Sequence, residues 1–162
     1  MAHAFLLTGI RGVGKTTTAR IIAKALNCVA DGNKKEPAFE ICNNCSPCKS
    51  INKGNFLDVI EVDAASRTGV DGIREIIDSV MYSPNNARYK VYIIDEVHML
   101  SNAAFNALLK TLEEPPQNVK FIFATTEIKK IPATIISRCQ KFDLQRVDIE
   151  TLTIHLNRIC EA

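Results

Sequence analysis

The chain has 162 residues, a length that suits one domain with a full hydrophobic core, or one domain with a small embellishment. Its net charge of +2 excludes binding to nucleic acid through bulk basic character, and its 46% apolar content is ordinary for a globular protein. The sequence contains no transmembrane run and no signal segment, which favours a cytoplasmic protein in which the six cysteines are metal ligands or free thiols.

The first predicted elements are a buried strand over Ala4–Leu7 and a helix over Thr17–Leu26. Between them, residues 9–16 read GIRGVGKT and fit the phosphate-binding pattern G-x-x-x-x-G-K-[ST]. A plain glycine-rich turn is the alternative, but it explains neither the strand before nor the helix after. We expect Lys15 to reach the β- and γ-phosphates of ATP and the Thr16 hydroxyl to ligate Mg²⁺. The expected nucleotide contacts in this loop are Gly9, Gly12, Val13, Gly14, Lys15, Thr16 and Thr17.

A group of four cysteines follows the first helix. Cys28 lies at its end, and Cys42, Cys45 and Cys48 come after a polar stretch. Four thiolates suit tetrahedral Zn²⁺ and leave no open coordination position, so we predict a structural zinc site within an insertion over residues 28–48. The C-x₂-C-x₂-C spacing also suggests an iron–sulfur cluster, although the Cys-Pro that follows in ferredoxins is missing. Unmetallated thiols are the third possibility.

Strands and helices alternate over the rest of the chain. This alternation predicts an α/β fold with a parallel sheet covered by helices on both faces. Strands are predicted at residues 57–63, 89–94, 120–125 and 141–144. Helices are predicted around residues 73–80, 105–112 and 149–159, with a short helix after Pro132 and with Asp148 as the cap of the last one. The polar motifs all follow strand ends, where parallel sheets bind ligands.

Two carboxylates, Asp95 and Glu96, come directly after the apolar strand at 89–94. This pattern is typical of a Walker B segment, in which Asp95 holds Mg²⁺ through water and Glu96 acts as the general base for the attacking water. Adjacent acids after a strand can also merely cap the next helix. Together with the phosphate-binding loop, the pair favours an enzyme that hydrolyses ATP over a kinase, which must exclude water.

Several polar side chains have two interpretations each. Thr126 either contacts the γ-phosphate or the water, or closes a local turn. Arg138 is either a solvated side chain or an arginine finger in a neighbouring subunit's site. Arg67, with Arg74, either starts a helix in solvent or contacts DNA or a subunit. The three histidines show no ligand spacing and are interpreted as structural: His3, His98 and His155.

Five segments resemble the gamma/tau family of the bacterial DNA polymerase III clamp loader, and the four cysteines narrow the match within the wider AAA+ family. These segments are residues 9–16, 63–68, 94–100, 106–116 and 137–139. The resemblance implies a P-loop AAA+ ATPase module with three layers, five parallel strands in the order 5-1-4-3-2, and an inserted zinc lobe. It places Thr126 at the sensor-1 position and Arg138 at the trans-acting arginine, so the catalytic residues implied are Lys15, Glu96, Thr126 and Arg138. The cofactors implied are ATP, Mg²⁺ and Zn²⁺.

The family also implies partners: the other clamp-loader subunits in a pentamer, the sliding clamp and primed DNA. Residues 1–162 would form one AAA+ nucleotide-binding domain, truncated at both ends relative to the family, without its adenine-packing segment, lid and collar. We therefore expect the isolated chain to be monomeric, with weak or no ATPase activity. The alternative is a non-catalytic, nucleotide-gated interaction module. A helicase half would need a second motor domain, for which the chain has no room.

Overall fold

The computed structural model describes residues 2–30, 37–66 and 70–161. Five strands form its sheet: β1 (Ala4–Thr8), β2 (Val59–Asp63), β3 (Lys90–Asp95), β4 (Val119–Thr125) and β5 (Gln140–Asp143). Six helices accompany them: α1 (Lys15–Asn27), α2 (Ser46–Asn52), α3 (Val70–Val80), α4 (Asn102–Glu113), α5 (Ala133–Ile136) and α6 (Ile149–Cys160). Two short 3-10 turns complete the described elements: η1 (Val97–Met99) and η2 (Ile128–Lys130).

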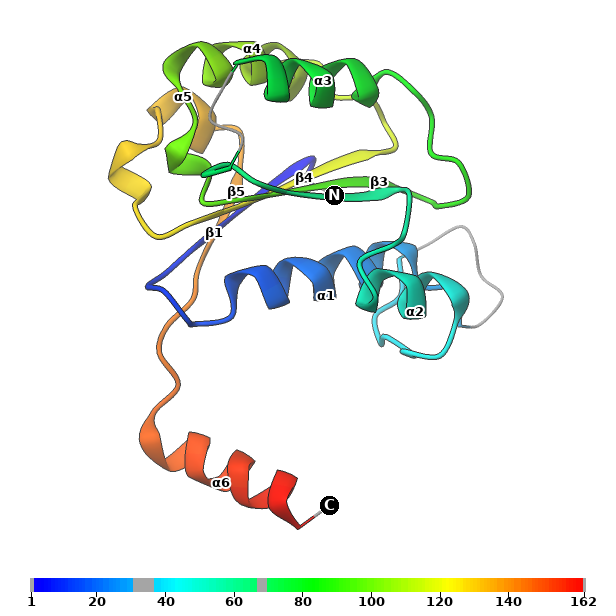
Figure 1. The fold of residues 1–162 in the computed structure, drawn as a ribbon, viewed down its shortest axis with the longest axis vertical. Coiled ribbons are helices and arrows are strands. Elements are labelled where there is room, and N and C mark those ends of the chain that lie inside the picture. Colours follow the sequence, from blue (N-terminus) through cyan, green and yellow to red (C-terminus); the bar gives the residue numbers. More distant parts are fainter. Residues whose placement is uncertain (1, 31–36, 67–69, 162) are drawn as a thin grey trace.

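The strands pair in parallel in the order β2-β3-β4-β1-β5, which confirms the predicted order. Because every pairing is parallel, each chain connection crosses a face of the sheet, and the carboxyl ends of all strands meet at one edge. Helices α3, α4 and α5 cover one face, and α1 and α2 lie against the other (Figure 1). The three predicted layers are therefore present, and polar residues that follow the strands converge on one edge.

Two apolar clusters, one on each face of the sheet, form the core. On the α3–α4 face, Tyr92, Phe121 and Phe123 pack beneath both helices. On the α1 face, Ile93 and Ile122 pack with residues of the helix. Successive strand residues point to opposite faces, so a strand covered on both faces must be apolar at every position. This explains the uninterrupted apolar runs from which the strands were predicted.

The sequence did not predict α2, which lies within the cysteine insertion. Its signals are short: Pro47 stands at the first helical turn, and Cys48 and Ile51, three residues apart, are both buried. The strand predicted from residue 57 begins at Val59 instead, because the buried carboxylate of Asp58 serves another purpose. It accepts hydrogen bonds of 2.8–2.9 Å from the N–H groups of three residues in the turn before β3, namely Asn85, Asn86 and Ala87.

The last helix, α6, differs from the others because none of its residues is buried. It projects away from the sheet and its covering helices (Figure 1). Asp148 caps it as predicted, accepting a 2.8 Å hydrogen bond from the backbone N–H of Thr151. Over the described ranges, none of the helices combines the length and the apolar character that crossing a membrane requires.

Candidate functional site

The phosphate-binding loop turns from β1 into α1, and its three glycines have positive φ angles, which residues with a side chain rarely adopt. Gly14, at the N-cap of α1, has φ 88°, in the left-handed region. Gly9 has φ 147°, and a Cβ atom there would lie 2.6 Å from the carbonyl oxygen of Leu144. The loop therefore fits closely under the segment that follows β5. The helix begins at Lys15, two residues before the predicted start, because the loop itself caps it.

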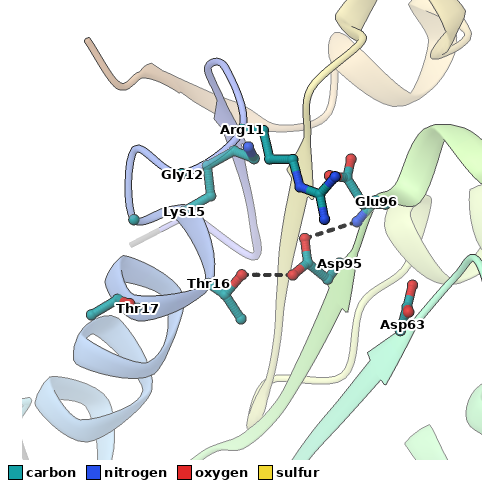
Figure 2. Close-up of a pocket in the computed structure, with 9 residues that line it drawn as sticks. Arg11, Gly12, Lys15, Thr16, Thr17, Asp63, Asp95 and Glu96 are labelled. Carbon is teal, nitrogen blue, oxygen red and sulfur yellow. Dashed lines mark hydrogen bonds between the residues drawn. The ribbon is translucent and has the colours of Figure 1, made fainter. Parts of the chain in front are cut away.

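The side chains of Lys15 and Thr16 are held by neighbouring groups of this chain. The Lys15 ammonium donates to the carbonyl oxygens of Gly9 and Ile10 at 3.1 and 3.0 Å, and the residue is 6% exposed. The Thr16 hydroxyl donates a 2.6 Å hydrogen bond to one carboxylate oxygen of Asp95, which links the loop to the end of β3 (Figure 2). The hydroxyl and the carboxylate predicted to share Mg²⁺ are thus in contact.

A cavity of about 460 Å³ opens beside this contact. Arg11 extends across it toward Asp95 and Glu96 (Figure 2). Gly9 and Val13, both predicted contacts, do not line it, and a Cβ atom on Gly9 would lie 3.0 Å from the Val13 side chain. The lining residues come from the loop, from the first turn of α1 and from the ends of β2 and β3: Arg11, Gly12, Gly14, Lys15, Thr16, Thr17, Asp63, Asp95 and Glu96.

Glu96 occupies an unusual backbone conformation at the end of β3. Its φ and ψ are 47° and 45°, in the left-handed region, and its N–H donates to the side chain of Asp95 at 2.9 Å. One carboxylate oxygen of Glu96, Oε2, accepts from both the N–H and the hydroxyl of Thr126, at 3.2 and 3.1 Å. Strained backbone of this kind is frequent at functional sites. Two predicted catalytic residues from neighbouring strands are therefore in direct contact.

His98 also belongs to this group, although the sequence suggested only a structural role. Its side chain is 6% exposed, and Nδ1 lies 3.3 Å from Glu96 Oε2 and 3.0 Å from the hydroxyl of Thr125. Nε2 lies 3.4 Å from Glu127. The pKa of Glu127 is lowered, mainly by the hydrogen bond from Lys130. Electrostatic interaction with Lys130 and with His98 lowers it further. His98 could have been found from its position two residues after Glu96, once β3 and β4 were taken as neighbours.

Arg138 lies outside the cavity lining, after α5. Its guanidinium donates to the carbonyl of Thr134 at 2.6 Å and to the carboxylate of Glu113, on α4, at 2.7 Å. A third of its side chain is exposed to solvent. Arg67, the other arginine with two interpretations, falls outside the described residues, and Arg74 lies on the exposed side of α3.

The four cysteine sulfurs of the insertion come together at the C-terminal end of α1, all within 4.8 Å of one another. Cys28 Sγ lies 3.5 Å from Cys42 Sγ and 3.9 Å from Cys45 Sγ. These distances exceed the roughly 2.05 Å of a disulfide. Tetrahedral zinc, with bonds of about 2.3 Å, requires sulfurs about 3.8 Å apart. The spacing therefore fits a four-thiolate metal site.

The surroundings of these sulfurs do not favour ionisation equally. The backbone N–H of Cys45 donates to Cys42 Sγ at 3.3 Å and, with the N–H of Asn44, lowers the pKa of Cys42 to about 6. Burial, the largest cause, raises the pKa of Cys48 well above that of an ordinary thiol. A bound cation is thus the element that would stabilise all four thiolates together.

Comparisons with known proteins agree with these features. A family model described as DNA polymerase III, delta subunit, matches residues 1–148. The chain is 56% identical to DNA polymerase III subunit tau of Bacillus subtilis strain 168, over 99% of this chain and 28% of that protein. It is 59% identical to DNA polymerase III subunit gamma of Buchnera aphidicola subsp. Acyrthosiphon pisum, over 93% of this chain and 40% of that protein.

A solved structure shares the fold. A DNA polymerase III gamma subunit-related protein from Thermotoga maritima superposes with a TM-score of 0.62 at 22% identity, over 93% of this chain and 43% of that one. At this identity the likeness concerns the arrangement of strands and helices alone. In all three comparisons the chain spans less than half of the protein that it matches.

Proposed function

We propose that the chain is an ATP-hydrolysing motor module of the clamp loader. It belongs to the DNA polymerase III family whose model matches residues 1–148, and within that family to the AAA+ region of the gamma/tau subunits. In this role it couples ATP to opening of the sliding clamp and to loading of the clamp onto primed DNA. Its partners are then the other subunits of the assembly, the clamp and the DNA, and its place is the cytoplasm, where the chromosome is replicated.

A single observation carries the proposal: one cavity gathers a phosphate-binding loop and a pair of carboxylates, joined by the bond from Thr16 to Asp95. In the bound state Lys15 exchanges its loop carbonyls for the β- and γ-phosphates, a stronger, charge-assisted contact. Thr16 and Asp95 would hold Mg²⁺, and the ion would supply positive charge against the phosphates. Glu96 accepts the proton of the attacking water.

Two residues complete the proposed mechanism. Thr126, which already contacts Glu96 through its hydroxyl, would report the presence of the γ-phosphate to the catalytic glutamate. Arg138 lies apart from the cavity of its own chain, so it would act on the nucleotide of a neighbouring subunit. There it would stabilise charge that develops on the γ-phosphate. Until then its partner is Glu113 of its own chain.

The cysteine cluster has a structural role in this proposal. Four thiolates leave zinc no open position for a substrate, and the cluster lies at the opposite end of α1 from the cavity. Zinc bound by Cys28, Cys42, Cys45 and Cys48 would join the insertion to the core. The backbone N–H that reaches Cys42 Sγ is the kind of contact that stabilises a metal-bound thiolate.

The test separates ATP binding from ATP hydrolysis in the full-length protein within its assembly. Glu96→Gln should leave Mg²⁺-ATP affinity unchanged and slow single-turnover hydrolysis by about 10²–10⁴-fold, the usual contribution of a general base. Lys15→Ala should weaken ATP binding by about 10–100-fold, because bonds to charged groups contribute about 1.5–3 kcal/mol. The matched control is His155→Ala, on exposed α6, which should change neither. Hydrolysis that survives Glu96→Gln would contradict Glu96 as the general base, and an assembly that binds ATP without hydrolysing it would contradict the motor function.

A further inference from the structure

His98 is held on both sides of its ring by the turn that follows Glu96. The 3-10 turn η1 places Val97 and Leu100 in the core beneath α3 and α4, and backbone bonds close it from Met99 to Glu96 and from Leu100 to Val97. This anchoring directs the His98 ring toward the end of β4. The ring therefore has one position, fixed by buried neighbours, rather than the freedom of a surface side chain.

The contacts of Nδ1 define what the ring offers to Glu96. Nδ1 lies 3.0 Å from Thr125 Oγ1 and 3.3 Å from Glu96 Oε2. Thr125 Oγ1 already accepts the N–H of Glu127, and an ionised carboxylate can only accept. With the proton on Nδ1, the ring donates to Thr125 Oγ1 and lies within ion-pair distance of Glu96 Oε2, which as a carboxylate can only accept. Glu127 Oε1 lies 3.4 Å from Nε2, on the opposite side of the ring.

The second donor to Glu96 is needed because Thr126 has two tasks. Its hydroxyl carries one hydrogen, which it donates to Glu96 Oε2 in this structure. If the same hydroxyl turns to a γ-phosphate, Glu96 loses that bond at the moment when it must be aligned with the attacking water. The backbone N–H of Thr126 and the ring of His98 are the donors that stay within reach of Oε2.

We propose that His98 is a positioning residue: through Nδ1 it holds the Glu96 carboxylate in place when the hydroxyl of Thr126 leaves it for the γ-phosphate. This inference rests on the proposed role of Glu96 as general base. His98 touches neither nucleotide nor water in this scheme. Its effect on the reaction passes entirely through the alignment of Glu96, where a displacement of about 1 Å can cost about 10²-fold in rate.

The test uses the shape of the amide side chains in the full-length protein within its assembly. The Nδ2 of Asn occupies the place of histidine Nδ1, whereas the Nε2 of Gln occupies that of histidine Nε2. His98→Asn should therefore keep a donor at the position that faces Glu96, whereas His98→Gln should move its donor to the opposite side, next to Glu127. We expect His98→Gln and His98→Ala to slow single-turnover hydrolysis by about 10–100-fold, with ATP affinity unchanged. His98→Asn should restore most of the rate.

The outcomes separate this inference from the function on which it rests. If Glu96→Gln still hydrolyses ATP, the general base itself is wrong. If Glu96→Gln is inactive while His98→Gln and His98→Ala keep the full rate, only the role of His98 fails. If His98→Asn is as slow as His98→Gln at an equal thermal midpoint, the ring acts through packing, and the proposal is again overturned. Should His98→Ala fail to fold, the Asn and Gln variants still decide.

Discussion

The two ends of α1 carry the two candidate sites of this molecule, about 20 Å apart by the rise of a 13-residue helix. At the N-terminal end, unpaired backbone N–H groups and the helix dipole attract an anion. At the C-terminal end, the carbonyl groups carry partial negative charge, and the four cysteines would add full negative charges as thiolates of a metal site. Phosphate thus meets a favourable field at one end, whereas thiolates meet an unfavourable one at the other.

The two ends also differ in how far they are satisfied without a ligand. At the N-terminal end Lys15 and Thr16 have partners within this chain, as described above. At the C-terminal end the Arg88 guanidinium donates to the carbonyl oxygens of Leu26 and Cys28, at 2.6 and 3.4 Å. The four sulfurs, however, contact one another and the backbone N–H groups of Asn44 and Cys45. The loop is therefore preformed, whereas the four thiolates of the proposed zinc site would need the metal to hold them together.

Zinc removal should therefore give the largest loss of stability, and the loss should be confined to the insertion at the C-terminal end of α1. Chelation, or Cys45→Ser, should release the metal and unfold the insertion, because structural zinc contributes apparent free energies of about 10–16 kcal/mol in small zinc domains. The loop should still bind Mg²⁺-ATP. Metal analysis, thermal unfolding and ATP titration measure the three quantities. Iron with visible absorbance, or no metal at all, would refute the zinc assignment, and loss of ATP binding would refute the independence of the two ends.

Matched glycine substitutions should give a smaller effect that sharpens the same contrast. Gly9→Ala combines φ 147° with a Cβ only 2.6 Å from the Leu144 oxygen, and strain of this kind costs about 1–3 kcal/mol. Gly54→Ala, just after α2 on the cysteine side, has φ 69° but open space around the new Cβ. It should cost about 1 kcal/mol, for backbone strain alone. Denaturant unfolding compares the two. Equal losses would mean that the loop does not depend on close contact with the segment after β5.

Acidification should give the smallest effect and separate the two ends by pH. Near the loop, the Thr8 hydroxyl donates to the Asp143 carboxylate, and this hydrogen bond is the largest cause that lowers the pKa of Asp143 below its ordinary 3.8. The neighbouring Lys141 lowers this pKa further. The stabilisation is complete above pH 3.8 and is lost as the pH falls through the lowered value. Metal-bound thiolates take up protons at higher pH, so zinc should leave first. A zinc indicator and carboxyl NMR follow the two steps, and Asp143→Asn should remove only the second.

Most of the fold could be predicted because the three central strands, β1, β3 and β4, are covered on both faces. Continuous apolar runs marked β1, β3 and β4, and the loop pattern joined β1 to α1. The insertion was harder, because α2 has only one turn of burial signal. Its buried residues are Cys48 and Ile51. In the sequence Cys48 is explained by metal binding, and Ile51 alone does not show a helical pattern. The start of β2 was also predicted too early, at residue 57 instead of Val59, because nothing in the sequence shows that Asp58 binds a distant turn.

The candidate site was predictable where its residues are consecutive and not where the fold must bring them together. Residues 9–16 and the pair at 95–96 form local patterns. The contact of His98 with Glu96 needs η1, and its contacts with Thr125 and Glu127 need the pairing of β3 with β4. The bond from Arg138 to Glu113 likewise joins two helices that no spacing rule connects.

Helix α6 has a further consequence for the behaviour of the chain in water. It has 12 residues, none of them buried, and isolated helices of about 12–15 residues are marginally stable. Its helix–coil equilibrium is therefore set by local terms, such as the cap at Asp148, rather than by the core. Its amide hydrogens should exchange with solvent through small local openings. Those of α1, packed beneath the sheet, should exchange mainly when the domain as a whole unfolds.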